Sequence, residues 1–223
     1  MPVALQVDGF LRGREEFVPS GLPAARFSWL GGVAAGFGAF YGLAMGSYGS
    51  LSWERWPQLA YSAAKVPLLL FLTYGLCVPT FFVLNSLCGL RTEVRTALFA
   101  LTAMQTCLAV VLASLAPLTL LAYASGIPYA PAVFFNGLVF AVASLASQVV
   151  VFRYYLPLIR EDRRHAAMLA VWLGLYIFIG IQAAWVLRPF VGNPDIAPQL
   201  FRPGAWGNAY IAVIKLTRQV LGG

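Results

Sequence analysis

The longest uncharged stretch of the chain runs from Thr96 to Phe152. As a single helix it would measure about 85 Å, whereas the hydrocarbon core of a bilayer is only about 30 Å thick. The stretch therefore has to fold back on itself. It can do so at Ser125–Pro131, where two prolines and a glycine cannot continue a helix. We predict a hairpin of two membrane-spanning helices.

This hairpin belongs to a set of five apolar segments that are long enough to cross a bilayer. The expected spans are Phe27–Ser50, Ala60–Gly89, Arg95–Ala124, Ala132–Tyr155 and Ala166–Leu187. The second and third exceed roughly 20 residues, so we expect them to tilt or bend. Prolines that could allow bending are Pro67, Pro79 and Pro117. The pattern predicts an all-α integral membrane bundle of five transmembrane helices.

Composition supports the same class of protein. Hydrophobic residues make up 60% of the 223 residues and charged residues 10%, whereas soluble domains are nearer one half and one quarter. A net charge of +7 could suggest nucleic acid as a partner. The basic residues, however, are dispersed at the ends of apolar segments, as in membrane proteins. We therefore expect membrane lipids as partners and no nucleic acid.

The placement of lysine and arginine predicts the topology. With the N-terminus in the cytoplasm, nine basic residues lie inside: Arg12, Arg14, Arg26, Arg91, Arg95, Arg153, Arg160, Arg163 and Arg164. The outer loops then carry Arg55, with Lys65 near the boundary of the second span. The tail favours the opposite orientation through Arg188, Arg202, Lys215 and Arg218. The short loops favour a cytoplasmic N-terminus and an outer C-terminus.

Two segments flank the predicted bundle at 26–187. Residues 1–25 mix apolar and charged side chains, which suits a segment resting on the inner surface. In 188–223, the stretch Asn208–Leu221 is too short to cross a bilayer and is amphipathic as a helix. It could lie on the membrane as an interfacial helix, or pack on the bundle or on a partner.

The first span is rich in glycine. Gly32 and Gly36 are four apart, and Gly38, Gly42 and Gly46 continue at the same spacing. Small residues at this spacing let another helix approach closely inside a membrane. We expect one stripe that contacts a partner helix, either within this chain or on another protein.

Polar side chains inside the spans have two interpretations. Gln105, Asn136 and Gln182 could be hydrogen-bonding contacts between helices, or they could line a polar pathway for a solute. Lys65, a charged residue near the interior of a span, is a functional candidate. Alternatively, it extends along its own stem to the interface.

The end of the fifth span is the most unusual local sequence. Trp185 and Arg188 suit a membrane interface, and Pro189 stops the helix before Phe190. A second Arg-Pro pair follows at Arg202. Proline and glycine at this density favour a fixed irregular structure. We predict an outer cap here, with an ordinary interfacial anchor as the alternative.

Patterns for catalysis are absent from the sequence. It holds no His-Glu-x-x-His, no paired intramembrane aspartates and no Gly-x-Ser-x-Gly. The single histidine, His165, cannot supply a usual metal site, and the three cysteines lie in apolar segments. We predict no catalytic, cofactor or metal site, and leave open a bound lipid.

Five spans between a short polar start and an outer tail resemble the layout of the Yip family of membrane-trafficking proteins and its bacterial relatives. Lys65-Val66-Pro67, the region of Asn85 and the segment Ala184–Phe190 are similar to a group of uncharacterised bacterial membrane proteins. The resemblance implies the topology and a bacterial inner membrane. It implies no catalytic or binding residue.

Together these features favour a non-enzymatic accessory or scaffold subunit of a larger membrane assembly, with other integral membrane subunits as partners. One alternative is a small transporter or channel for a solute or lipid, which would need the buried amides to line a common cavity. Another is an intramembrane enzyme acting on lipid, with Arg188 and Arg202 binding a phosphate.

Overall fold

The computed structural model describes residues 7–9, 12, 24–49, 55–193, 196–202 and 211. Helices make up 84% of this part of the chain, and it contains no strand. The helices are α2 (Ala24–Gly46), α3 (Trp56–Leu87), α4 (Val94–Ala124), α5 (Tyr129–Glu161) and α6 (Arg164–Leu187). Each predicted span coincides with one of them, which confirms the predicted all-α fold.

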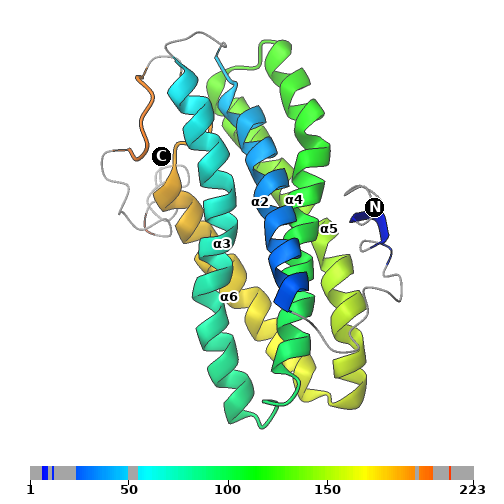
Figure 1. The fold of residues 1–223 in the computed structure, drawn as a ribbon. Helices are drawn as coiled ribbons and strands as arrows, with labels where there is room; N and C mark the ends of the chain where they lie inside the picture. Colours follow the sequence, from blue (N-terminus) through cyan, green and yellow to red (C-terminus); the bar gives the residue numbers. More distant parts are fainter. Residues whose placement is uncertain are drawn as a thin grey trace, which may run out of the picture.

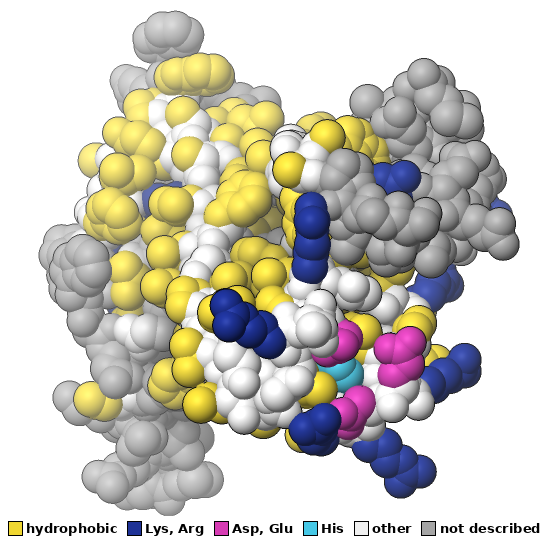
Figure 2. Space-filling view, turned by 60° about the horizontal axis from the view of Figure 1, so that its bottom comes forward, with side chains coloured by type: hydrophobic (Ala, Val, Ile, Leu, Met, Phe, Trp, Pro, Cys, Tyr) yellow, Lys and Arg dark blue, Asp and Glu magenta, His cyan; other side chains and the backbone are white. Residues whose placement is uncertain are grey.

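All five helices are long and apolar enough to cross a membrane. Their outward faces carry large hydrophobic side chains, such as Phe134 at 69% exposure and Leu145 at 72%. In Figure 2 such side chains cover the flanks of the bundle. Apolar surface on this scale is unfavourable in water and favourable against lipid tails, so the chain has the properties of an integral membrane protein.

Helix α2 lies between α3 and α4 over much of their length, although these two are consecutive in the chain (Figure 1). On the outer sides, α6 packs against α3 and α5 packs against α4. The largest core cluster surrounds the fully buried Trp172 of α6, whose ring meets Phe81 and Tyr74 of α3 edge to face. A second cluster surrounds Tyr41 of α2.

The predicted hairpin is formed by α4 and α5. Helix α4 ends at Ala124, and α5 begins only a few residues later at Tyr129. Gly126 has a φ of 73°, a left-handed conformation that glycine adopts without strain. Pro128 is the residue that precedes α5. The turn is therefore tight, as its glycine and prolines predicted.

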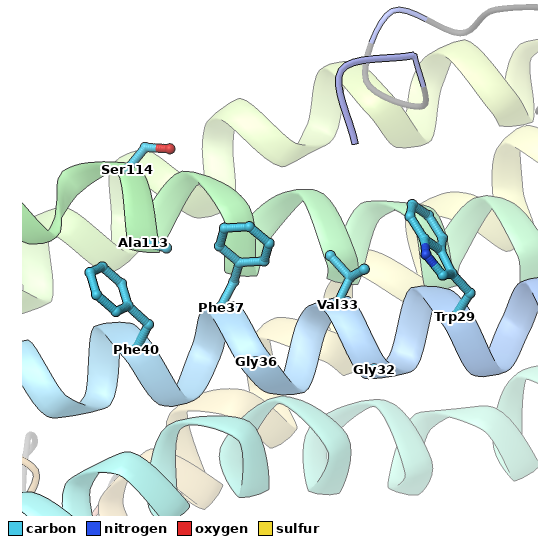
Figure 3. A pocket seen from close by; sticks show the side chains of 8 residues that line it. All are labelled: Trp29, Gly32, Val33, Gly36, Phe37, Phe40, Ala113 and Ser114. Atoms are coloured by element: carbon cyan, nitrogen blue, oxygen red, sulfur yellow. The ribbon is translucent and has the colours of Figure 1, made fainter. Parts of the chain in front are cut away.

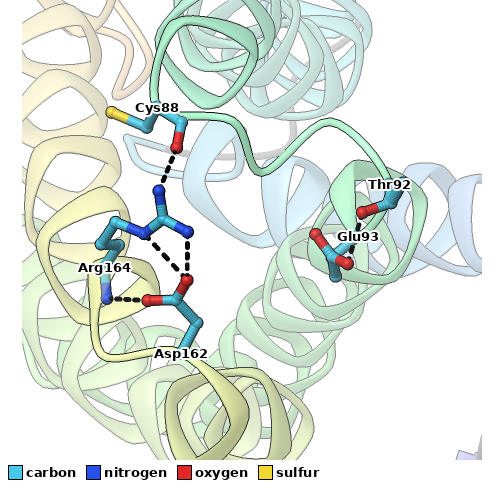
Figure 4. Close-up of polar contacts among 5 residues, drawn as sticks. All are labelled: Cys88, Thr92, Glu93, Asp162 and Arg164. Atoms are coloured by element: carbon cyan, nitrogen blue, oxygen red, sulfur yellow. Dashed lines mark hydrogen bonds and ion pairs between the residues drawn. The ribbon is translucent and has the colours of Figure 1, made fainter.

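The opposite end of the bundle, with the α3–α4 and α5–α6 turns, carries most of the described charged residues (Figure 2). Arg164 joins the two turns, because its guanidinium donates to the Cys88 carbonyl at 2.7 Å and pairs with Asp162 at 2.6 Å (Figure 4). Hydrogen bonds from Arg164 hold the pKa of Asp162 below its usual value. Asp162 thus stays ionised and keeps this connection.

The predicted terminal segments lie largely outside the described residues. In the N-terminal region, Val7 is buried and packs beside Val33 of α2 and Val110 of α4. The predicted interfacial helix Asn208–Leu221 lies outside the described part of the chain except for Ile211, so it stays a prediction.

Candidate functional site

The chain that follows α6 lies against the beginning of α3. We call residues 188–193 the post-α6 segment. A row of four polar side chains on one face of α3 and its N-terminal flank meets this segment: Arg55, Gln58, Ser62 and Lys65. Their spacing of three, four and three residues places them on one helix face.

Each side chain in this row donates to a backbone carbonyl of the post-α6 segment. Lys65 Nζ donates to the Pro189 carbonyl at 2.7 Å, and Ser62 Oγ donates to the Phe190 carbonyl at 2.5 Å. Gln58 Nε2 reaches the same Phe190 oxygen at 3.2 Å. Arg55 Nη2 completes the row on the Asn193 carbonyl at 2.7 Å.

These hydrogen bonds have a clear physical reason. An irregular segment cannot satisfy its own carbonyl groups, and unsatisfied groups are costly away from water. The row on α3 supplies the missing donors, so it fixes the chain where α6 ends. Lys65 is only 1% exposed, and its ammonium group ends on the Pro189 carbonyl just beyond the end of α6; its two predicted interpretations stay open.

The end of α6 carries a second polar group. The guanidinium carbon of Arg188 lies 3.5 Å from the ring centroid of Trp185, and that of Arg202 lies 4.3 Å from the same centroid. We call Trp185, Arg188 and Arg202 the Trp–Arg cluster. Burial lowers the pKa of Arg188, and the charge of Arg202 lowers it further. The two cations are thus close enough to repel each other.

The structure divides the predicted glycine stripe into two faces. A Cβ atom on Gly42 would lie 2.3 Å from the Ser62 carbonyl oxygen, and one on Gly46 would lie 2.9 Å from Leu59 Cα. Gly38 also faces α3, with more room. For Gly32 and Gly36, no atom of a described residue lies within 4 Å of such a Cβ. The step of two residues from Gly36 to Gly38 turns the helix by about 200°, so the two sets cannot share a face.

Gly32 and Gly36 border an open groove instead. This α2–α4 groove has a volume of about 700 Å³ and is lined by Trp29, Gly32, Val33, Gly36, Phe37, Phe40, Ala113 and Ser114. In Figure 3 the aromatic side chains and Val33 follow one another along α2 and point toward α4. The Ser114 hydroxyl already donates to the Val110 carbonyl of its own helix, so the lining is almost entirely apolar.

The three amides of the predicted polar pathway have separate surroundings. The Tyr176 hydroxyl donates to Gln105 Oε1, between α6 and α4. Asn136 accepts from Tyr41 at 2.9 Å and donates to Tyr123 at 2.7 Å, which joins α5 to α2 and α4. Gln182 is half-buried in α6. None of the three lines the α2–α4 groove, and the pathway stays a prediction.

Sequence reasoning missed the row on α3. Its signal is the recurrence of polar residues at helical spacing from Arg55 to Lys65 in an otherwise apolar helix. Predicting its acceptors was not feasible, because they lie more than a hundred residues away along the chain.

The site residues can hold an irregular backbone segment, accept an apolar helix or attract an anion. Among the described residues, no three histidine, cysteine, aspartate or glutamate side chains are grouped as a metal site requires. No protein-family model, no curated protein and no solved structure matches the chain.

Proposed function

We propose that this protein is a non-enzymatic accessory subunit of a larger membrane assembly, and that the α2–α4 groove receives a transmembrane helix of its partner. The observation that supports this proposal is the pair of open glycines in the groove. Gly38, Gly42 and Gly46 contact α3 within the bundle, whereas Gly32 and Gly36 contact no helix in the described part of the chain.

The chemistry of the groove favours a helix as its occupant. In lipid, helices associate mainly through close packing, and glycines four residues apart let two backbones approach. Gly32 and Gly36 provide this spacing, and the neighbouring Phe37 and Phe40 provide apolar walls. None of the described residues that line the groove is charged. An apolar transmembrane helix with small residues at its contact face fits this surface.

We propose the bacterial cytoplasmic membrane as the location, with the N-terminus inside and the C-terminus outside. The distribution of charge supports this orientation. Six exposed arginines surround the α3–α4 and α5–α6 turns, namely Arg91, Arg95, Arg153, Arg160, Arg163 and Arg164. Cytoplasmic loops are the ones enriched in lysine and arginine. The bacterial assignment rests on the sequence resemblance.

Filling the groove is expected to release the partner. In a Gly32→Leu, Gly36→Leu variant, two side chains would occupy the space that the partner helix needs. Particles extracted from native membranes in mild detergent should lose a stoichiometric membrane subunit, while this chain itself is still recovered in folded form. The matched control is Gly137→Leu, Gly174→Leu, because these two glycines also have open space but lie on α5 and α6. A groove variant that keeps the same particle mass as the control would contradict the proposal.

A photo-crosslinking residue identifies the occupant directly. Phe40 lines the groove and is 54% exposed, whereas Phe134 is 69% exposed on α5. A benzoyl-phenylalanine at position 40 should crosslink to a transmembrane segment of a second protein, and one at position 134 should not. Crosslinks from position 40 to lipid only, or to another copy of this chain, would overturn the accessory-subunit proposal.

A further inference from the structure

The Trp–Arg cluster holds buried donors without an acceptor among the described residues. Arg188 Nε and Nη2, Arg202 Nε and Trp185 Nε1 are buried, and none has a hydrogen-bond partner among the described residues. No described acidic side chain forms an ion pair with either arginine. A buried polar group without a partner typically costs about 1–3 kcal/mol, and more when it is charged. Four such groups in one cluster are chemically suited to bind an acceptor that the described residues do not supply.

The charge of the cluster points to the chemistry of that ligand. Stacking on Trp185 favours each cation, but it leaves the N–H groups of the guanidinium planes unsatisfied. The two arginines also repel each other. An anion that accepts from both would satisfy the donors and cancel the repulsion at once. Arginine is the residue best suited to this, because its planar fork binds phosphate and carboxylate through two parallel hydrogen bonds.

The geometry lets one anion reach both arginines. The guanidinium carbons of Arg188 and Arg202 lie 3.5 Å and 4.3 Å from the same Trp185 ring centroid. The distance between the two carbons is therefore at most the sum of these two distances. Arg188 and Arg202 are half-buried as residues, so part of each lies at the surface of the described structure. The backbone next to Arg188 is held by the row on α3, because Lys65 donates to the Pro189 carbonyl and Ser62 donates to the Phe190 carbonyl.

We propose that Trp185, Arg188 and Arg202 form a binding site for a phosphate oxyanion at the end of the bundle where α6 terminates. Trp185 lies in the last turn of α6, and tryptophan at the end of a membrane span typically lies among the lipid headgroups. The phosphate can therefore come from an anionic phospholipid or from free inorganic phosphate. The site is separate from the α2–α4 groove, so it holds or fails independently of the accessory-subunit proposal.

The test uses the full chain purified in dodecyl maltoside, a detergent without phosphate. The midpoint of thermal unfolding is recorded against three probes at matched ionic strength: inorganic phosphate, dioleoylphosphatidylglycerol and dioleoylglycerol, which has the same acyl chains without the phosphate. A ligand that binds only the folded state raises the midpoint as its concentration rises, which yields its affinity. Stabilisation by phosphatidylglycerol alone identifies a lipid headgroup, and stabilisation by phosphate as well identifies the free ion as a second source.

Variants show whether the cluster is responsible. Arg188→Gln and Arg202→Gln should each weaken binding at least about tenfold, because a hydrogen bond to a charged group is lost. Arg188→Lys, Arg202→Lys keeps both charges and removes the forks, so it should fold normally and still bind more weakly. The control is Arg91→Gln, Arg163→Gln, two exposed arginines at the opposite end, and it should bind as the parent does.

Three results would overturn the site. They are equal stabilisation by phosphatidylglycerol and dioleoylglycerol, no stabilisation of the parent protein by either phosphate probe, and unchanged affinity in a well-folded Lys or Gln variant. The first would indicate binding of acyl chains, and the second would indicate that water alone satisfies the donors. The third would place the phosphate elsewhere on the protein.

Discussion

Replacing Gly42 by alanine is expected to force α2 away from α3 and to destabilise the folded protein strongly. A Cβ atom at this position would lie 2.3 Å from the Ser62 carbonyl oxygen and 2.8 Å from Ala63 Cα. Both are backbone atoms of a helix, so no flexible side chain can move aside. Overpacking in a close-packed interior costs about 1–3 kcal/mol, occasionally more. We expect the upper end of this range, measured as a lower midpoint of thermal unfolding in detergent.

Gly36→Ala is the matched control, because the same change on the same helix meets no atom within 4 Å. Alanine has a higher helix propensity than glycine by about 1 kcal/mol, so this variant should be as stable as the parent or slightly more so. The opposite signs of the two effects test the division of the glycines into two faces. Equal behaviour of the two variants would show that α2 and α3 are further apart than described.

The membrane-spanning helices could be predicted from the sequence because their lengths follow from apolar runs and from proline and glycine positions. The third expected span, Arg95–Ala124, differs from α4 by one residue at its start. The fourth was expected to end at Tyr155, yet α5 continues to Glu161. The length of an apolar run limits how many residues can lie in lipid, whereas the pattern of backbone hydrogen bonds determines the residue at which a helix ends. A helix can therefore project beyond the bilayer with charged residues on it.

The glycines show where a spacing argument needs the helical angle as well. Within each set the spacing is four residues, but the interval from Gly36 to Gly38 is two. Adding up the rotation of about 100° per residue would have placed these two sets of glycines on different helix faces without a structure. The sequence could not indicate that Gly42 and Gly46 meet α3 while Gly32 and Gly36 meet no other described residue. That assignment depends on which helices become neighbours.

The candidate sites were predictable in part. Trp185, Arg188 and Arg202 were identified from composition, since aromatic and basic residues gather where a span ends. That both arginines stack on one indole ring depends on how the chain returns after Pro189, which no local pattern specifies. The row from Arg55 to Lys65 depends in the same way on a segment that is distant in sequence.

Replacing Lys65 by methionine is expected to make the post-α6 segment open away from α3 more often. Methionine has a similar length and apolar stem but no donor, so the Pro189 carbonyl loses its 2.7 Å hydrogen bond in a buried position. A hydrogen bond to a charged group contributes about 1.5–3 kcal/mol. Local opening of the segment should therefore become about 10- to 100-fold more frequent. Lys65→Glu should have a larger effect, because it places an acceptor against the carbonyl.

A cysteine at position 191 reports this opening, because Val191 is 4% exposed in the attached state. In a background with Cys77, Cys88 and Cys107 replaced, Val191→Cys should react slowly with a membrane-impermeant maleimide. Adding Lys65→Met should raise the rate of labelling about 10- to 100-fold, in proportion to the more frequent opening. Arg91→Met removes an exposed cation at the opposite end of the bundle and should leave the rate unchanged. If Lys65→Met also leaves the labelling rate unchanged, the other donors on α3 are sufficient to hold the post-α6 segment. Lys65 would then need a role other than structural support, because a buried cation in a membrane-spanning helix is costly to retain.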